Sequence, residues 1–161
     1  MKQLMLILLS FALLLGCVQD TGSTGASDSM ENDSMSDGGD ALAAGGIPYV
    51  PYTKAAYESA KADGKIVFLE FYANWCPICA DQETELVSAF ESLDYDNIAA
   101  FRVNYKDSDT DDDEKNLARE FGVTIQHTHI IVGADGETIK RSSESWDKDR
   151  IISEIENARG A

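Results

Sequence analysis

The sequence predicts a single α/β domain in which a mixed β-sheet is flanked by helices on both faces. The chain has 161 residues, which suits one ordinary domain, and 43% of them are hydrophobic, which is sufficient for a globular core. Helical and β-forming segments alternate along the chain, and an Asp-Gly turn typical of a hairpin separates the last two strands. The predicted order is therefore α-β-α-β-α-β-β-α.

Local patterns set the bounds of each predicted element. Thr53 can cap a helix that runs to about Asp63, and Gly64 ends it. The dense β-forming run at 66–72 is typical of a strand covered on both faces. The acidic run at 107–114 is expected to be a solvent-facing loop with acids at a helix N-terminus. The other predicted elements are a helix from near Cys76 to about Leu93, a strand at 98–104, a short helix ending at 121–122, strands at 129–132 and 138–141, and a helix at about 147–158.

The first 16 residues are typical of a signal peptide. A short basic start is followed by a twelve-residue apolar run at 4–15, whereas a helix needs about 20 residues to span a bilayer. Cys17 follows a small residue at the end of this run, which resembles the lipobox of prokaryotic lipoproteins, where the cysteine is lipidated and becomes the mature N-terminus. The sequence therefore predicts a lipid anchor at Cys17 in the cell membrane, facing the extracytoplasmic side. A plain secretory signal is the alternative.

Residues 17–46 are predicted to be an acidic tether, and residues 47–161 the folded domain. From 18 to 46 there are six acidic residues, no Lys or Arg and no aromatic residue, so this segment cannot bury enough apolar surface to fold. The whole chain has a formal net charge of −16, which argues against nucleic acid as a partner because phosphates need a basic surface.

The strongest chemical signal is the pair Cys76 and Cys79, which follows the predicted buried strand and begins a helix. Two cysteines at this spacing can form a small disulfide ring, and a helix N-terminus stabilises the thiolate of the first. Cys76 is therefore the candidate nucleophile and Cys79 the resolving cysteine. The alternatives are a structural disulfide, which gains little stability from so short a loop, and half of a zinc site, which would need two further cysteines if built from cysteines alone.

The runs at 69–76 and 121–123 resemble the strand leading to the active site and the later approach to it in the thioredoxin family. The resemblance covers about 50–158 and is greatest to the exported thioredoxin domain of thiol:disulfide interchange proteins. It implies a thioredoxin-like fold and a thiol–disulfide oxidoreductase that needs no cofactor. Its partners would be protein dithiols and disulfides outside the cytoplasm. The resemblance also implies that Trp75 and Pro77 contact the substrate.

Glu70 lies six residues before Cys76, where the family carries a buried acid below the second cysteine. A carboxyl group in a largely apolar strand is expected to have a raised pKa. The resemblance implies that it takes a proton from Cys79 during exchange. The alternative is a glutamate that faces solvent at a sheet edge.

His127 stands where the family has a cis-proline beside the cysteines. If the protein is an oxidoreductase, His127 is a residue of the substrate-binding loop. His127→Pro is then expected to preserve or raise thiol–disulfide exchange. The competing hypothesis is a copper or zinc site formed by Cys76, Cys79 and His127, with His129 as a fourth ligand. The segment at 126–136 also resembles that of thioredoxin-fold copper chaperones, although their cysteines are separated by three residues. The sequence favours redox chemistry over metal binding, and a binding module without turnover is the third possibility.

Overall fold

The structure is a computed structural model that describes residues 40–43 and 45–161. The predicted signal peptide at 1–16, Cys17 and most of the predicted tether lie outside these residues. Within the described residues, no helix is both long and apolar enough to cross a membrane. The elements in chain order are β1 (Tyr49–Pro51), α1 (Lys54–Ala62), β2 (Ile66–Tyr72), α2 (Pro77–Glu91), β3 (Ile98–Asn104), α3 (Asp112–Glu120), β4 (Thr128–Val132), β5 (Thr138–Ser142) and α4 (Lys148–Arg159).

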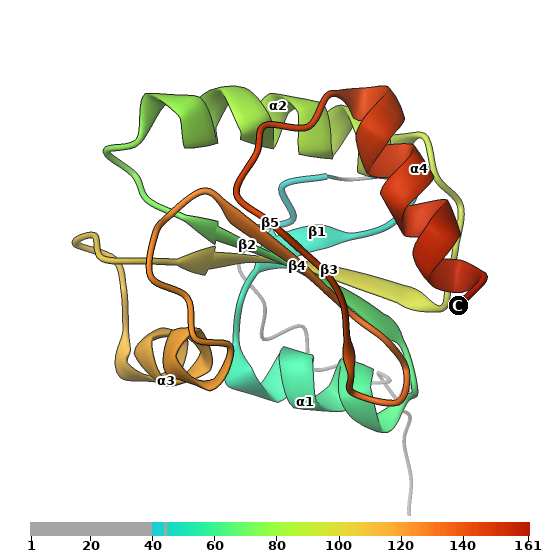
Figure 1. Cartoon of the computed structure of the whole chain (residues 1–161), viewed down its shortest axis with the longest axis horizontal. Helices are drawn as coiled ribbons and strands as arrows, with labels where there is room; N and C mark the ends of the chain where they lie inside the picture. The colour runs from blue at the N-terminus through green and yellow to red at the C-terminus, as the bar shows by residue number, and fades with distance from the viewer. Residues whose placement is uncertain (1–39, 44) are drawn as a thin grey trace, which may run out of the picture. The chain divides into compact units, whose positions relative to one another are not determined.

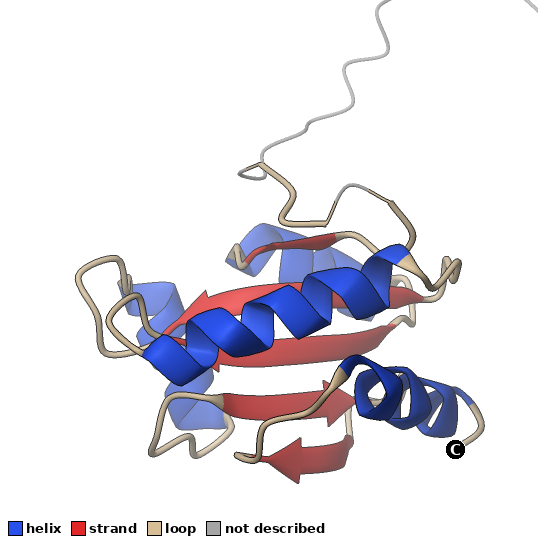
Figure 2. Ribbon diagram, turned by 90° about the horizontal axis from the view of Figure 1, so that it is seen from above, coloured by secondary structure: helices blue, strands red, loops and turns tan. Residues whose placement is uncertain are grey.

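The five strands form one mixed sheet with the order β1-β3-β2-β4-β5 (Figure 2). Strands β1 and β2 both pair with β3 in parallel, whereas β4 runs antiparallel to β2 and to β5. Helices α2 and α4 cover one face of the sheet, and α1 and α3 cover the other (Figure 1). This arrangement confirms the predicted mixed sheet flanked by helices.

Strand β1 is the one element that the sequence did not predict. The segment contains prolines at 48 and 51, which exclude a helix but do not by themselves predict a strand. Proline is tolerated in a strand at a sheet edge, where no ladder hydrogen bond is lost, and β1 is an edge strand. The strand matters for function because it brings Tyr49 beneath the central strand.

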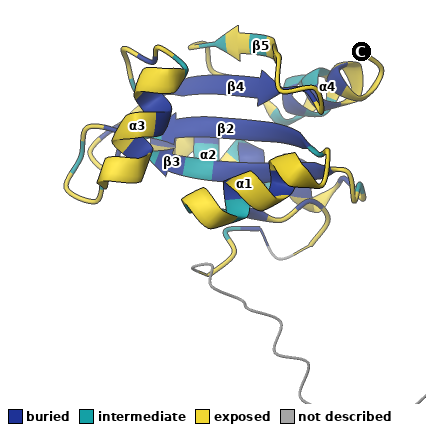
Figure 3. Cartoon of the chain, turned by 90° about the horizontal axis from the view of Figure 1, so that it is seen from below, coloured by how far each residue is buried: buried dark blue, intermediate teal, exposed yellow. Residues whose placement is uncertain are grey.

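Alternation along β2 sends neighbouring residues to opposite faces of the sheet, and nearly all of the strand is buried (Figure 3). Phe68 packs in the apolar cluster beneath α2 and α4, whereas Leu69 and Phe71 pack in the cluster on the α1 and α3 side. Glu70 lies two residues after Phe68 and therefore faces α2 and α4. In register, its neighbours are Arg102 on β3 and His129 on β4.

The chain contacts the domain before residue 47. The backbone N–H of Leu42 donates to the carbonyl of Tyr49 at 2.7 Å, and Ala43 is buried. Gly46 has a φ of +63°, and a Cβ there would collide with the carbonyl oxygens of Phe90 and Leu93. Only glycine fits this approach to the end of α2. Ordered contacts thus begin inside the segment that the sequence assigned to the tether.

Candidate active site

Cys76 and Cys79 form a disulfide at the start of α2, with their Cα atoms 5.3 Å apart. Cys76 is the N-cap of the helix, and its Sγ accepts a hydrogen bond from the backbone N–H of Cys79 at 3.3 Å. Pro77 occupies the first turn, where a missing N–H is tolerated. After reduction, the free N–H groups and the helix dipole favour the thiolate of Cys76. Cys79, one turn inside the helix, is fully buried.

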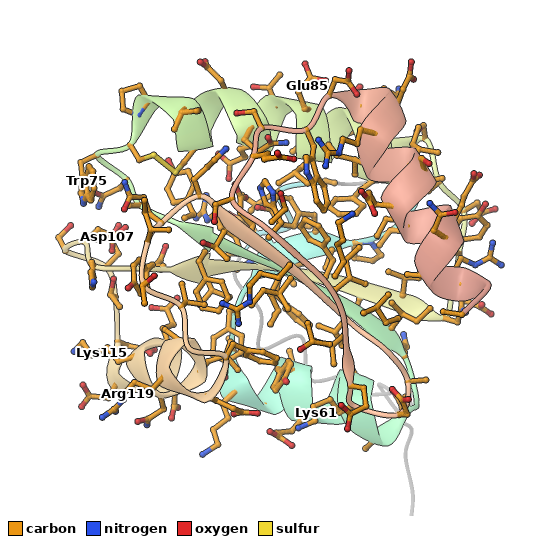
Figure 4. The ribbon with its side chains drawn as sticks, viewed as in Figure 1. Lys61, Trp75, Glu85, Asp107, Lys115 and Arg119 are labelled. Carbon is orange, nitrogen blue, oxygen red and sulfur yellow. A yellow bond between two sulfur atoms is a disulfide. The ribbon has the colours of Figure 1, made fainter. Side chains whose placement is uncertain are left out.

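The side chains flanking the disulfide are exposed. Trp75 and Ile78 have exposed fractions of 56% and 49%, and Pro77 is also exposed. The indole N–H of Trp75 donates to the carbonyl of Lys106 at 3.2 Å, which fixes the ring at the end of the sheet (Figure 4). Two of the three residues predicted to contact a substrate, Trp75 and Pro77, thus lie at the surface. The third, His127, is buried.

The acidic loop after β3 holds the turn that precedes Cys76. Asp107 accepts a hydrogen bond from the backbone N–H of Asn74 at 2.9 Å, and the Asn74 amide donates to Ser108 and Asp109. Partial burial acts to raise the pKa of Asp107, but hydrogen bonds from Asn74 and Thr110 outweigh it and hold this pKa below its usual value. The sequence predicted a solvated loop and gave no sign of this contact, because the pairing joins residues more than thirty positions apart.

Glu70 is fully buried, as predicted. Burial raises the pKa of its carboxyl group to about 8, although a hydrogen bond from the Tyr49 hydroxyl to Oε2 opposes the increase. The other oxygen, Oε1, lies 3.9 Å from Nε2 of His129 and has no hydrogen-bond partner within the described part of the chain. The partner Tyr49 was missed because β1 was not predicted. Proton transfer from Cys79 to Glu70 stays a prediction.

His127 has a φ of +60°, in the left-handed region that few residues other than glycine adopt. Its backbone N–H donates to the carbonyl of Phe71 at 2.7 Å, and its Nε2 lies 3.1 Å from the hydroxyl of Ser145. Proline fixes φ near about −65° and has no N–H, so it does not fit this backbone. His127→Pro would therefore require a change of the backbone at this position, and its effect on exchange stays a prediction.

His129 is fully buried in an aromatic environment. Its ring stacks on Phe68 at a centroid distance of 5.9 Å and lies 4.9 Å from Trp146 and 5.2 Å from the His127 ring. Burial lowers the pKa of His127, and it lowers the pKa of His129 to about 3. His129 is therefore neutral at pH 7, and neither of its ring nitrogens has a hydrogen-bond partner in the residues that the structure describes.

The structure brings together a different set of polar groups from the one predicted for a metal. Glu70, His127 and His129 each offer one ligand atom, and these atoms lie within 4.8 Å of one another. Among the described residues this group includes neither Cys76 nor Cys79, which are bonded to each other. Of the four predicted ligands, only the two histidines join this group, and Glu70 is the member that sequence reasoning assigned to proton transfer.

The Thioredoxin family model matches residues 48–157, which is more than half of the chain. The chain belongs to the thioredoxin family. The match spans β1 to β5, α1 to α3 and most of α4, and it includes Cys76 and Cys79, so the protein is a thioredoxin-family redox protein. A comparison with curated proteins finds no match.

Solved structures agree with this assignment. Trxlp from Edwardsiella tarda is 31% identical, with a TM-score of 0.55, over 65% of this chain and 95% of that chain. A mutant thioredoxin from Halobacterium salinarum is 24% identical, with a TM-score of 0.53, over 71% of this chain and 90% of that one. A protein described as DsbH Oxidoreductase is 20% identical, with a TM-score of 0.55, over 73% and 87%. The last two show that the fold is shared.

Proposed function

We propose that the protein is a membrane-anchored, extracytoplasmic thiol–disulfide oxidoreductase that uses the dithiol of Cys76 and Cys79. One observation carries the redox part of the proposal. Cys76 caps α2, its Sγ accepts a hydrogen bond from the backbone N–H of Cys79, and the two cysteines form a disulfide. A sulfur in this position is a stabilised thiolate when reduced and a good leaving group when oxidised.

The exchange follows from the positions of the two sulfur atoms. The Cys76 thiolate attacks a disulfide of the partner, and a mixed disulfide forms while one partner sulfur leaves as a thiolate. Cys79 then attacks the Cys76 sulfur, which restores the Cys76–Cys79 disulfide and releases the second partner sulfur. Two electrons pass from the dithiol to the partner, and the reverse sequence oxidises a partner dithiol. Because Cys79 is fully buried, it reacts within the mixed disulfide rather than with a free partner.

Protein substrates suit the surface around the disulfide. Trp75 and Ile78 expose large apolar side chains beside Cys76, and such side chains are enriched at protein interfaces. The membrane anchor is supported by the apolar run at 4–15 and by Cys17 at its end. Mass spectrometry of the native N-terminus tests the anchor, which requires a lipidated Cys17 as the first residue. An unmodified Cys17, or a mature start beyond residue 20, would contradict it.

The redox proposal is tested by trapping. Cys79→Ser is expected to accumulate a mixed disulfide with its partner on a non-reducing gel of an envelope extract, because Cys76 can attack but nothing releases it. Cys76→Ser is expected to trap far less, and the double variant none. Cys17→Ser, with both active-site cysteines intact, is the control for exchange through the third cysteine. Equal trapping by the two single variants, or no exchange with any protein disulfide, would contradict the proposal.

A further inference from the structure

We propose a binding site for a divalent metal ion inside the domain, formed by Glu70, His127 and His129. The ligand atoms of these residues lie within 4.8 Å of one another, and the residues expose 0%, 6% and 0% of their surface. The site contains neither cysteine of the disulfide, so it does not rest on the proposed redox function. It also differs from the set of cysteines and histidines that the sequence suggested.

Unpartnered polar atoms within the group point to a ligand. Glu70 Oε1, His127 Nδ1 and both ring nitrogens of His129 are buried without a hydrogen-bond partner among residues 40–43 and 45–161. Buried polar groups are nearly always paired, because an unpaired one loses its bonds to water without replacing them. Here several such atoms face one another. The full sequence has two histidines, and both lie in this group.

Neighbouring hydroxyl groups engage one polar atom of Glu70 and one of His127, and the second atom of each stays available to a metal. The Tyr49 hydroxyl donates to Oε2 of Glu70, which leaves Oε1 free. The Ser145 hydroxyl lies 3.1 Å from Nε2 of His127, which leaves Nδ1 free. Metal-binding sites hold their ligands in this way, with an outer partner on the second atom of each carboxylate or imidazole. Tyr49 and Ser145 are therefore positioning residues for the site.

The donor set favours zinc. Two imidazoles and one carboxylate bind Zn²⁺ in sites that keep a fourth position open, whereas copper(I) prefers sulfur. Zinc lies about 2.0–2.2 Å from nitrogen and oxygen ligands, so two ligands of one ion are at most about 4.4 Å apart. The 3.9 Å between Glu70 Oε1 and His129 Nε2 meets this limit, whereas the 4.8 Å that bounds all three ligand atoms exceeds it slightly, so metal binding requires a small rotation of a side chain.

The direct test uses the full chain, without a histidine tag and with its disulfide oxidised. Calorimetric titration with Zn²⁺ is expected to show one equivalent bound. Co²⁺ as a spectroscopic probe is expected to give visible bands without a sulfur-to-metal charge-transfer band. Gln in place of Glu70, His127 or His129 is expected to weaken binding about 100-fold or more, since even outer partners contribute about 10–100-fold. Serine in place of each of the three cysteines is expected to leave the affinity unchanged.

A gentler pair of variants keeps the test decisive if the ligand variants fail to fold. Tyr49→Phe and Ser145→Ala remove only the outer hydrogen bonds, and each is expected to weaken zinc binding about 10-fold. Tyr105→Phe and Ser92→Ala are matched controls that remove a hydroxyl elsewhere, from contacts with the carbonyls of Val123 and Ala89, and should bind zinc as the unaltered chain does. Several results would overturn the proposal: no zinc bound, loss of binding on removal of a cysteine, or equal affinities in the outer variants and their controls.

Discussion

The two faces of the central sheet differ in what they bury. On the α1 and α3 side, Leu69 and Phe71 of β2 pack within a cluster of apolar and tyrosine side chains. On the α2 and α4 side, Phe68 shares the interior with Glu70 and His129. The buried polar side-chain atoms that lack a partner in the described residues all lie on this second side. They belong to Glu70, Arg102, His127, His129 and Trp146.

Because of this difference, the two sides of the sheet are expected to contribute to stability in different ways. Apolar burial contributes about 25 cal/mol per Å² and does not depend on pH, so the apolar cluster on the α1 and α3 side contributes the same stability at every pH. Unpaired polar atoms subtract from stability, and ionisable ones make it depend on pH. The α2 and α4 side carries the disulfide at the start of α2, and it is the side that binding and ionisation can alter.

The largest expected effect that separates the faces is a pH dependence due to Glu70. Its pKa is about 8 in the folded protein, against an ordinary value of 4.5 in an unfolded chain, so the folded state holds an extra proton between these pH values. Stability due to Glu70 is therefore fully present below about pH 4.5 and is lost as the pH rises towards 8. His129, whose pKa is lowered to about 3 by burial, has the opposite slope between about pH 3 and 6.5.

Comparison with Glu70→Gln isolates the effect of Glu70 from that of the histidines. The free energy of unfolding of the variant minus that of the unaltered chain is expected to rise by up to about 5 kcal/mol between pH 4.5 and 8, at about 1.4 kcal/mol per pKa unit. Urea unfolding at several pH values, with a chelator present to remove metal, measures it. A difference that stays constant with pH would show that Glu70 does not titrate in this way.

A large truncation on the other face is expected to act equally at every pH. Phe71 is fully buried and packs edge-on against Tyr105 at a centroid distance of 6.2 Å. Phe71→Ala is expected to lower the free energy of unfolding by about 3–5 kcal/mol, because it removes apolar contacts and leaves a cavity. Ile139→Ala, at a side chain that is 40% exposed, is the control and should lose much less. A loss for Phe71→Ala that varies with pH would break the contrast between the faces.

The smallest expected effects come from removing the hydrogen bonds of one polar side chain on each side of the sheet. Gln82 donates to the carbonyl of Trp146 at 2.8 Å and accepts from its N–H at 2.7 Å. Gln82→Ala leaves both backbone groups unpaired and is expected to cost about 1–3 kcal/mol. On the α1 and α3 side, Tyr105→Phe removes one hydrogen bond to the carbonyl of Val123 and is expected to cost about 1 kcal/mol. Thermal unfolding of both variants checks the order, and a larger loss for Tyr105→Phe would reverse it.

Local patterns in the sequence determined most of the fold, the burial of Glu70 and the position of Cys76. The apolar run around Glu70 predicted its burial, and the position of Cys76 before a helix predicted a capping sulfur; the structure agrees with both. These features depend on neighbours within a few residues, where periodicity and helix-end chemistry act. The hairpin at the Asp-Gly turn and the cap at Thr53 were predictable for the same reason.

Only the tertiary structure decided which polar groups meet. Glu70 lies beside His129 because of the register of β2 against β4, and Tyr49 reaches Glu70 because β1 joins the sheet beyond β3. His127 combines a left-handed backbone with a hydrogen bond from its N–H to Phe71, and proline fits neither feature. Each of these contacts joins residues that are far apart in the chain. Strand pairing and packing fix such contacts, and no short stretch of sequence encodes them.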